Sequence, residues 1–380
     1  MHKIRILHII THLPIGGAQD NTLSTIERLN KDRYAISLMS GPEGDWKRRA
    51  LEIEGVNLII IHEMVRDVHL FKDAIAFVKI FIEIRRGKYD IVHTHSSKPG
   101  FYGRIAAKLA GTPIIVHTIH GFPFHDFMPM IIKQFFIFIE KFLSRLSDKI
   151  ITVSKLNLKQ ALNLELAAPK KFVNIYSGID FSKFDQKIDV EKKRHELKIC
   201  DHVKIIGVIG RLTRCKGLPY FYRAIQIVSK KREDILVLII GDGELRYMNE
   251  EMVNRLGIAS CVRFLGFRDD VPQLLKILDV YVLSSLWEGL GRALTEALYT
   301  LRPTVATSVA GVPELVKNNE TGILVPPANP TALAEGILYL LDNPQLALRL
   351  AKNARALVKT KFCVNEMVHQ IDQLYQELIT

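Results

Sequence analysis

Short apolar runs rich in β-branched residues alternate with helix-length segments along most of this chain. In the first half such runs lie at residues 4–10, 35–39, 58–61, 90–93, 113–118 and 149–153. The segments between them, such as 18–29 and 98–110, have the length of helices. Strands that alternate with helices form parallel sheets buried on both faces, because each connection must cross over the sheet. The first half is therefore predicted to be doubly wound α/β.

This alternation stops in a polar, charge-dense stretch at 181–201 and then starts again. The second series of apolar runs lies at 203–209, 235–240, 262–265, 280–283, 304–307 and 323–325, and the tail from 329 to 380 has a helical pattern throughout. A chain of 380 residues can form two cores. We predict an α/β fold of two doubly wound Rossmann-like domains with an interdomain cleft, where the carboxyl ends of the strands bind ligands.

The domain boundaries follow from the same pattern. We expect the domains to comprise the segments 1–185 (N-terminal domain), 186–200 (linker), 201–360 (C-terminal domain) and 361–380 (a final helix that could pack back on the N-terminal domain).

The formal net charge is +12, and most of the excess lies in the first half of the chain. Such a charge favours anionic partners: phosphates, nucleic acid or anionic lipid. Basic residues are spread over both halves without a helix-turn-helix, RNP or zinc-finger pattern, so a non-enzymatic nucleic-acid binder is the weaker alternative. The four cysteines form no CxxC pair, and no apolar stretch has the length of a membrane span. We therefore expect a reduced, cytoplasmic protein.

A glycine pair, Gly16 and Gly17, lies between the first apolar run and the first helix-length segment. Glycines at this point let backbone amides approach an anion at the start of a helix. The pattern is not GxGxxG, which disfavours a dinucleotide site of the dehydrogenase kind. A bare tight turn is an equally good explanation of the pair.

Arg211 and Lys216 follow the run at 203–209 and lie five residues apart. On a loop after a strand, a guanidinium and an ammonium group at this spacing can converge on one diphosphate. The alternative is a solvated basic loop.

The segment 279–297 carries the strongest pattern, because an apolar run leads into a glycine-rich turn and then into a helix. Glu288 lies on the turn and Glu296 lies eight residues later, on the helix. A carboxylate accepts two hydrogen bonds at once, which suits a vicinal diol. Two carboxylates beside a helix start could therefore hold two sugars with a diphosphate between them. In the alternative reading, Glu288 only offsets the helix dipole and Glu296 is solvated.

Histidines also gather at the ends of two predicted strands. His93 and His95 are two residues apart and share one face, while His117 and His120 end the next run. No cysteine or carboxylate completes a ligand set at the usual spacing, so we predict no metal site. A polar role in lining the cleft is expected, and a satisfied core histidine is the alternative for His120.

Taken together, these motifs resemble glycosyltransferase family 4, a large retaining group with the GT-B fold. The resemblance runs from about residue 1 to about residue 360 and includes the order and spacing of the motifs. The run 117–125 is similar to the branch that builds capsular, exopolysaccharide and O-antigen (lipopolysaccharide) repeat units. The motifs that carry the resemblance are Gly16-Gly17, His120, Arg211 with Lys216, Gly241-Asp242-Gly243-Glu244, and Glu288 with Glu296.

The resemblance implies a retaining transfer of a hexosyl or N-acetylhexosaminyl unit from a nucleotide diphosphate sugar, with UDP favoured over GDP. It implies a lipid-linked or saccharide acceptor bound by the first domain, a donor bound by the second, and no metal or other cofactor. The implied catalytic residues are His120, Arg211, Lys216 and Glu288. The implied donor-binding residues are Gly16, Gly17, Gly243, Arg268, Gly289, Leu290, Gly291, Arg292, Ala293 and Glu296.

The chain departs from the family pattern at Leu301 and Ala310, where glycine is common. Both lie beyond the expected diphosphate contacts, so the departure concerns local loop geometry. A nucleotide-sugar epimerase shares the architecture and is a closer alternative than a nucleic-acid binder. It would need catalytic carboxylates in the first half, where Asp90 and Asp126 are the candidates.

Two segments of the first half, 69–88 and 130–143, mix aromatic and aliphatic residues with lysine and arginine. A basic amphipathic helix can lie on anionic lipid, which would place the protein at the inner face of the cytoplasmic membrane. The alternative is a crossover helix that faces the core, as every βαβ unit requires.

Overall fold

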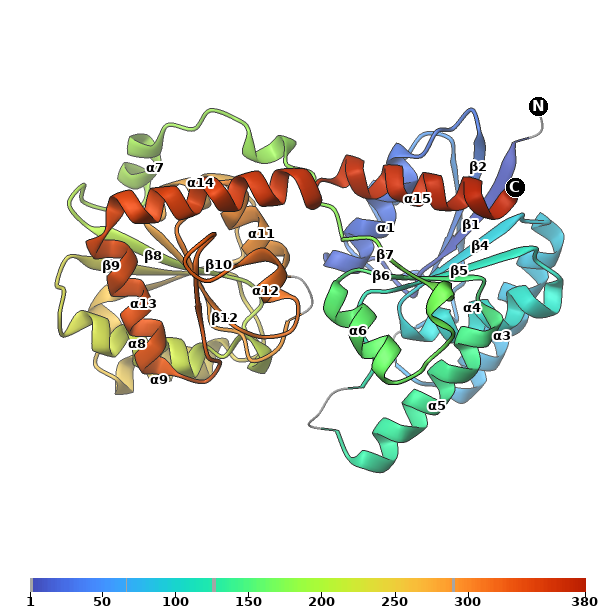
Figure 1. Cartoon of the computed structure of the whole chain (residues 1–380), viewed down its shortest axis with the longest axis horizontal. Helices are drawn as coiled ribbons and strands as arrows, with labels where there is room; N and C mark the ends of the chain where they lie inside the picture. Colours follow the sequence, from blue (N-terminus) through green and yellow to red (C-terminus); the bar gives the residue numbers. More distant parts are fainter. Residues whose placement is uncertain (1–2, 66, 125–127, 289–290) are drawn as a thin grey trace. The chain divides into compact units, whose positions relative to one another are not determined.

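The computed structural model describes residues 3–65, 67–124, 128–288 and 291–380, and in it the chain forms two compact units. Unit 1 comprises Met1–Gly178 and Val364–Thr380, and unit 2 comprises Ile179–Cys363. Each unit is a parallel sheet with helices on both faces, as Figure 1 shows. The two predicted doubly wound folds are confirmed.

Unit 1 is built on a seven-stranded parallel sheet with the order β3-β2-β1-β4-β5-β6-β7. Its strands are β1 (Ile4–Ile9), β2 (Tyr34–Ser40), β3 (Val56–Ile60), β4 (Ile91–His95), β5 (Ile114–Ile119), β6 (Lys149–Thr152) and β7 (Phe172–Asn174). Its helices are α1 (Gly17–Arg28), α2 (Lys47–Leu51), α3 (Leu70–Gly87), α4 (Ser97–Ala110), α5 (Met130–Leu146), α6 (Lys155–Asn163), the 3-10 turn η1 (Pro169–Lys171) and α15 (Val364–Ile379).

Successive residues of β1 pack on opposite sides of this sheet. Ile6 lies in a core shared with α1 and α15, whereas Leu7 lies in a second core shared with α3 and α4. Because both faces are covered, most residues of the central strands are apolar, and this explains the apolar runs in the sequence.

Unit 2 is built on a six-stranded parallel sheet with the order β10-β9-β8-β11-β12-β13. Its strands are β8 (Lys204–Ile209), β9 (Ile235–Ile240), β10 (Val262–Gly266), β11 (Val280–Leu283), β12 (Thr304–Thr307) and β13 (Ile323–Val325). Its helices are α7 (Val190–Glu196), α8 (Leu218–Ser229), α9 (Arg246–Arg255), α10 (Val271–Ile277), α11 (Arg292–Tyr299), α12 (Val312–Leu315), α13 (Pro330–Asp342) and α14 (Pro344–Lys361), with 3-10 turns η2 (Ser182–Phe184), η3 (Arg214–Lys216) and η4 (Ala259–Cys261).

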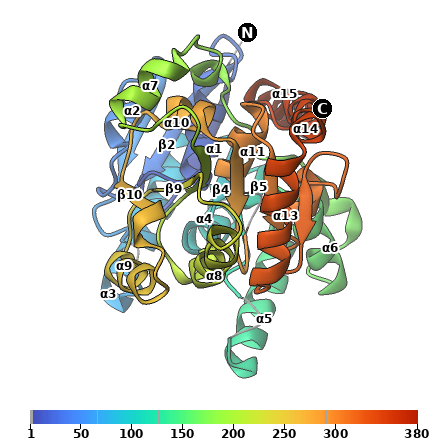
Figure 2. The ribbon, with the colours of Figure 1, turned by 90° about the vertical axis from the view of Figure 1, so that its left-hand side faces the viewer.

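One face of the unit 2 sheet is covered by α8 and α13, which lie next to each other in Figure 2. Phe221 and Ile225 of α8 pack with Leu333 and Ile337 of α13 in the same buried cluster as Val208 of β8. On the other face a side chain at Gly207 would lie 2.4 Å from Leu278 Cδ1, so β8 is packed without space on both sides.

The unit boundaries differ from the predicted domains, because residues 179–185, predicted in the N-terminal domain, belong to unit 2. The predicted linker 186–200 is part of unit 2, where α7 contacts α10. Lys193 Nζ of α7 lies 2.8 Å from Asp270 Oδ2 and 2.6 Å from Glu196 Oε2. Because this helix is held by ion pairs, its composition is polar and resembles that of a linker. The final helix, α15, belongs to unit 1 and contacts α1.

Both departures from glycine lie at strained backbone positions. Leu301 has a φ of 61° and Ala310 a φ of 47°, in the left-handed region that glycine enters at no steric cost. Leu301 ends the turn between α11 and β12, and Ala310 lies in the loop before α12. The unusual residues are therefore accommodated by local strain.

Ala310→Gly should stabilise unit 2 by about 0.5–1 kcal/mol, because glycine removes the strain of a Cβ at positive φ. The matched control is Ala356→Gly on the exposed side of α14, which should destabilise unit 2 by about 1 kcal/mol. Urea denaturation of the two variants measures both effects. A destabilised Ala310→Gly protein would contradict the strain argument.

Candidate functional site

The loops that follow β8 and β11 meet at the point where the unit 2 sheet reverses its strand order. β9 lies on one side of β8 and β11 on the other, so the chain leaves these strands toward opposite faces. Sheets of this kind leave a crevice at the carboxyl ends of the two diverging strands, and ligands bind there. The residues singled out in the second half, Arg211, Lys216 and Glu288, lie on these two loops.

An ion pair joins the two loops at this reversal of the sheet. Lys216 Nζ lies 2.8 Å from Glu288 Oε2, and the two side chains are only 17% and 16% exposed. Ser285 Oγ donates a hydrogen bond to the same carboxylate oxygen at 2.9 Å, and Ser284 Oγ donates one to the Lys216 carbonyl at 2.8 Å. Ammonium and carboxylate groups are thus fixed side by side at the reversal of the sheet.

The close approach of these loops depends on Gly217, which has a φ of 60°. A side chain there would lie 2.2 Å from the Ser284 carbonyl oxygen, and backbone atoms cannot move away cheaply. Leu286 N–H also donates a hydrogen bond to the Cys215 carbonyl at 2.7 Å. The glycine therefore allows the backbone contact that places Lys216 against Glu288.

The second carboxylate, Glu296, lies on α11. This helix begins at Arg292 after Gly291, whose φ is 82°, and continues through Ala293. Glu296 is 9% exposed, and Arg292 Nε donates a hydrogen bond to it at 2.9 Å. Burial raises the pKa of the Tyr281 phenol well above its usual value, and the negative charges of Glu288 and Glu296 raise it further by a smaller amount. The two acidic side chains thus act on the same buried tyrosine.

Arg211 is placed differently, because its side chain is 69% exposed and its Nε lies 3.4 Å from Glu244 Oε2. Such an exposed pair holds the guanidinium weakly and leaves it available to a ligand. The Glu244 loop is packed against the Arg211 loop, since a side chain at Gly243 would lie 2.7 Å from the Leu212 carbonyl oxygen. The loops after β8 and β9 therefore form one surface.

Arg268 follows the end of β10, but its guanidinium is already engaged. Its Nε and Nη2 donate hydrogen bonds to the two carboxylate oxygens of Asp270 at 2.7 and 2.6 Å. Hydrogen bonds from this guanidinium hold the pKa of Asp270 far below its usual range, despite partial burial. Within unit 2, Arg268 joins the β10–α10 loop to Glu196 of α7 at 3.6 Å.

In unit 1 the glycine pair begins α1, with Gly16 as the cap and Gly17 as the first helical residue. A side chain at Gly17 would meet nothing within 4 Å, so the start of this helix is open. His120 directly follows β5 and is partly exposed. Its Nε2 lies 3.3 Å from His95 Nδ1, and burial lowers the pKa of His120 to about 4.

Two of the predicted site residues, Gly289 and Leu290, lie outside the described residues, and so does Asp126. Asp90 accepts a hydrogen bond from the Arg5 backbone N–H at 2.8 Å, which ties β1 to the start of β4. Sequence reasoning missed Ser284, Ser285 and His8. The signal for the serines was their position at the end of a strand, and for His8 its place within the first apolar run.

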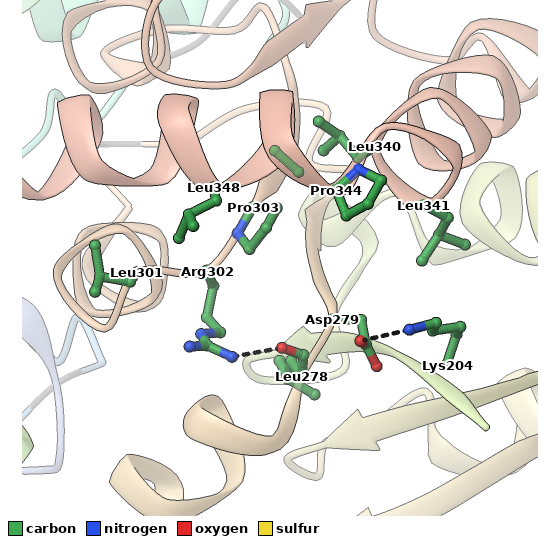
Figure 3. Close-up of a pocket in the computed structure, with 11 residues that line it drawn as sticks. Lys204, Leu278, Asp279, Leu301, Arg302, Pro303, Leu340, Leu341, Pro344 and Leu348 are labelled. Atoms are coloured by element: carbon green, nitrogen blue, oxygen red, sulfur yellow. Dashed lines mark hydrogen bonds and ion pairs between the residues drawn. The ribbon is translucent and has the colours of Figure 1, made fainter. Parts of the chain in front are cut away.

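A separate pocket of about 230 Å³ lies at the opposite end of the unit 2 sheet, where strands begin (Figure 3). Arg302 Nη1 donates a hydrogen bond there to the Leu278 carbonyl at 2.7 Å, and Lys204 lies 3.6 Å from Asp279. Its two basic side chains are thus already paired, and the rest of the lining is mostly leucine and proline. Because this pocket lies where the strands begin, it is distinct from the charged site at the carboxyl ends of β8 and β11.

The two Rossmann-like units define the class of two-domain α/β proteins, and in unit 2 an ion pair lies where the strand order of the sheet reverses. Residues 15–183 match the family described as Glycosyltransferase Family 4, and residues 189–357 match Glycosyl transferases group 1. The UDP-Gal:alpha-D-GlcNAc-diphosphoundecaprenol alpha-1,3-galactosyltransferase of Escherichia coli is 30% identical over 99% of this chain and 98% of that protein. The capsular polysaccharide biosynthesis glycosyltransferase CapM of Staphylococcus aureus is 25% identical over 100% of this chain and 98% of that protein.

Among solved structures, Anabaena Alr3699/HepE in complex with UDP and glucose has a TM-score of 0.86 at 22% identity, covering 98% of this chain and 100% of that chain. This similarity establishes the GT-B fold. The chain belongs to glycosyltransferase family 4, and it is an enzyme that transfers sugars. The predicted family and activity are confirmed, and the family favours the transferase over the epimerase and the nucleic-acid binder.

Proposed function

We propose that this enzyme moves a sugar, with retention of configuration, from a UDP-sugar to a lipid-linked saccharide in the assembly of a cell-surface polysaccharide. The observation that carries the proposal is the Lys216–Glu288 pair at the reversal of the unit 2 sheet. Such a pair offers positive charge to a diphosphate and carboxylate oxygens to sugar hydroxyls. The Escherichia coli relative, whose name specifies a UDP-sugar donor and a diphosphoundecaprenol acceptor, supports the choice of both substrates.

In the proposed reaction an acceptor hydroxyl attacks C1 of the donor sugar from the face that the leaving group occupies. The bond between C1 and the β-phosphate oxygen breaks, and the hydroxyl proton passes to a phosphate oxygen of the departing UDP. Negative charge grows on that diphosphate, and Lys216, the exposed Arg211 and the start of α11 supply fixed positive potential. The complete sequence has no DxD motif, so these groups are proposed to act in place of a divalent ion.

Within this proposal Glu288 holds hydroxyls of the donor sugar and Glu296 holds the ribose hydroxyls. Glycines 16, 17 and 243 and the backbone of 289–293 approach the phosphates. His120 lies beside the transferred sugar, and Arg268 borders the nucleotide base. Because the Nε and Nη2 of Arg268 are hydrogen-bonded to Asp270, its aliphatic stem and the flat face of its guanidinium are the parts left to contact a base.

UDP-sugars should raise the melting temperature of the protein equally in EDTA and in Mg²⁺, because fixed side chains neutralise the diphosphate. A ligand at 100 times its Kd stabilises the native state by about 2.7 kcal/mol, which is easily seen in a thermal-shift screen. GDP-sugars at equal concentration are the matched control. A shift that needs Mg²⁺, or one produced only by GDP-sugars, would refute this assignment.

The proposed acceptor is tested by measuring the release of UDP with and without it. An undecaprenyl-diphosphate-linked GlcNAc acceptor should release UDP from the preferred donor, whereas the donor alone should release little. An epimerase would instead convert the donor without any acceptor.

We also propose that unit 1 contacts an anionic membrane surface. α5 buries only Ile137, Glu140, Leu143 and Ser144, and Figures 1 and 2 both show it projecting from the unit 1 sheet. None of the described helices is long and apolar enough to cross a bilayer. Large exposed apolar side chains lie along both α3 and α5: Leu70, Phe71, Ile75, Val78, Ile82, Met130, Ile131, Ile132, Phe135, Phe138 and Phe142.

We call these exposed side chains the apolar face. Basic residues lie between them on both helices, at Lys72, Lys79, Lys133 and Lys141. Phe135 and Phe138 are 60% and 69% exposed, although burying a phenylalanine is worth about 1.5–3 kcal/mol. Apolar groups flanked by lysines are suited to the interface of an anionic bilayer, which would also bring the enzyme to a lipid-linked acceptor.

Replacing Phe135 and Phe138 together with serine should weaken binding to vesicles containing phosphatidylglycerol by about tenfold or more, because two apolar anchors are lost. The control is Leu51→Ser, which removes a side chain that is 64% exposed on α2, outside the apolar face. Vesicle sedimentation measures both. Equal binding by the double variant and the wild type would rule out this surface.

A further inference from the structure

Histidines lie on one face of the unit 1 sheet, on strands that are neighbours. The register pairs His8 of β1 with His93 of β4, and His95 of β4 with Thr118 of β5. Alternate residues of a strand point to the same face, so His93 and His95 project together. Tyr375 of α15 reaches this group, with its hydroxyl 2.5 Å from His93 Nδ1.

Three of the imidazoles form a continuous chain of hydrogen bonds. His8 Nδ1 lies 3.0 Å from His95 Nε2, and His95 Nδ1 lies 3.3 Å from His120 Nε2. His8 and His95 are 0% and 1% exposed, whereas His120 is partly exposed. The chain thus runs from the interior of unit 1 to the residue that ends β5.

All members of this chain are neutral at physiological pH. Burial lowers the pKa of His8 to about 3 and that of His120 to about 4. Burial and the neighbouring imidazoles hold the pKa of His95 well below its usual value. Each ring therefore carries one N–H and one lone pair.

The arrangement is a stack of hydrogen-bonded rings and differs from a metal chelate. Ring nitrogens of His8, His93 and His95 lie within 4.8 Å of one another. However, the His93 and His95 rings stack at 4.2 Å, and the His8 and His95 rings are within 14° of parallel. Lone pairs lie in the ring planes, so the ring of His93, which stacks on that of His95, does not aim its lone pairs at His95. Both nitrogens of His93 also lie within hydrogen-bond distance of other partners, Tyr375 and Thr118. The nitrogens of His95 are also both engaged in hydrogen bonds within the chain.

A neutral His95 has only one N–H, so both hydrogen bonds of the chain must run in the same direction. In one direction His8 donates to His95 and His95 donates to His120, which leaves His8 Nε2 as a bare acceptor. In the other direction His8 Nε2 carries a hydrogen. Among the described residues His8 Nε2 has no hydrogen-bond partner and is buried. Buried N–H groups without an acceptor are rarer than unsatisfied acceptors, which favours the first direction.

We propose that His8 and His95 are positioning residues that hold His120 in the tautomer with Nδ1–H, and that this N–H donates a hydrogen bond to an oxygen of the transferred sugar. That a sugar is the ligand rests on the proposed function, whereas the tautomer of His120 does not. Within the described residues the hydrogen bond of the His120 side chain is made by Nε2 and none is made by Nδ1, so the Nδ1 donor is left for a ligand. A histidine in the wrong tautomer keeps its place but loses the required donor.

The tautomer is measured directly by ¹⁵N NMR of the full chain with labelled histidine, without any ligand. The chemical shifts of the two ring nitrogens distinguish a protonated from a bare nitrogen, and the spectrum of His120→Ala assigns the resonances. We expect His120 to carry its hydrogen on Nδ1 and to have a bare Nε2. The reverse assignment, or an equal mixture of the two forms, overturns the proposal.

Two variants of His8 test whether this residue fixes the tautomer of His120 through its hydrogen bond to His95. His8→Asn keeps an N–H near the position of Nδ1, whereas His8→Leu removes it. We expect His8→Leu to shift His120 toward a mixture of tautomers and to lower kcat about tenfold with little change in KM, as loss of a histidine-orienting partner does elsewhere. His8→Asn should retain more of both properties. Equal behaviour of the two variants contradicts the proposal.

If His8→Leu does not fold, the wild-type spectrum still decides the tautomer. If His120→Ala transfers sugar at the wild-type rate, the placement of His120 in the active site fails, and the ¹⁵N result stands separately. The two failures are therefore distinguishable.

Discussion

Lys216→Ala is expected to lower kcat by about 10²- to 10³-fold, the loss typical when one fixed charge is removed from the site of a developing anion. The ammonium faces Glu288 across the reversal of the unit 2 sheet, where the leaving diphosphate is proposed to gain charge. That charge grows as the bond breaks, so kcat should fall more than KM for the donor rises. Steady-state kinetics with a saturating acceptor provide the measurement.

The matched control is Arg214→Ala, because this basic residue lies on the same loop but is exposed. Removing Arg214 changes the local charge by the same amount as removing Lys216. It should nevertheless alter kcat by less than about threefold, because the charge of Arg214 is solvated. Comparable losses in the two variants would mean that the loop contributes only general positive potential. Melting temperatures of both proteins show whether either change disturbs the fold.

Glu140→Ala is expected to destabilise unit 1 by about 3–5 kcal/mol, because it leaves a buried guanidinium without its counterion. Arg104 of α4 is fully buried, and its Nη1 and Nη2 donate hydrogen bonds to the two Glu140 oxygens at 2.8 and 3.1 Å. Its Nε donates a further hydrogen bond to the Gly100 carbonyl at 2.6 Å. The pair joins α4 to α5, which carries much of the apolar face.

The control for this experiment is the double variant Arg104→Met with Glu140→Leu, which replaces both charges with apolar groups and should leave the stability of unit 1 nearly unchanged.

Trp46 belongs to unit 1 and Trp287 to unit 2, so in a Trp287→Phe background the fluorescence reports unit 1. Urea denaturation followed in this way gives the free energy of unfolding. A cost below about 1 kcal/mol for Glu140→Ala would show that water reaches Arg104.

Much of the fold could be predicted from the sequence because both sheets are parallel and buried on both faces. Strands such as β9, β11 and β13 are continuous apolar runs, and their bounds coincide with those of the predicted runs. β7 was missed because it has three residues of intermediate burial at the edge of its sheet. The segment with α7 was assigned to a linker because ion pairs hold this helix, and such partners are not visible in a local pattern.

The positions of several site residues could be predicted from the sequence, whereas the contacts between these residues were less predictable. Spacing indicated that Lys216 and Glu288 lie on loops after strands, but not that strand order makes these loops neighbours. Arg268 was expected from the family resemblance, whereas its hydrogen bonds to Asp270 depend on the geometry of a turn. His8 was read as part of an apolar strand, because the sequence does not show that β1 lies beside β4.

The chain's last helix has a consequence for biosynthesis. Unit 2 is one uninterrupted segment, whereas unit 1 needs α15, which is synthesised after the whole of unit 2. Domains generally fold as they are made, N-terminal first. Here the half that is translated first must wait until the segment after unit 2 has been made before Tyr375 can pack on its histidines, so loss of α15 would damage the N-terminal half of the enzyme.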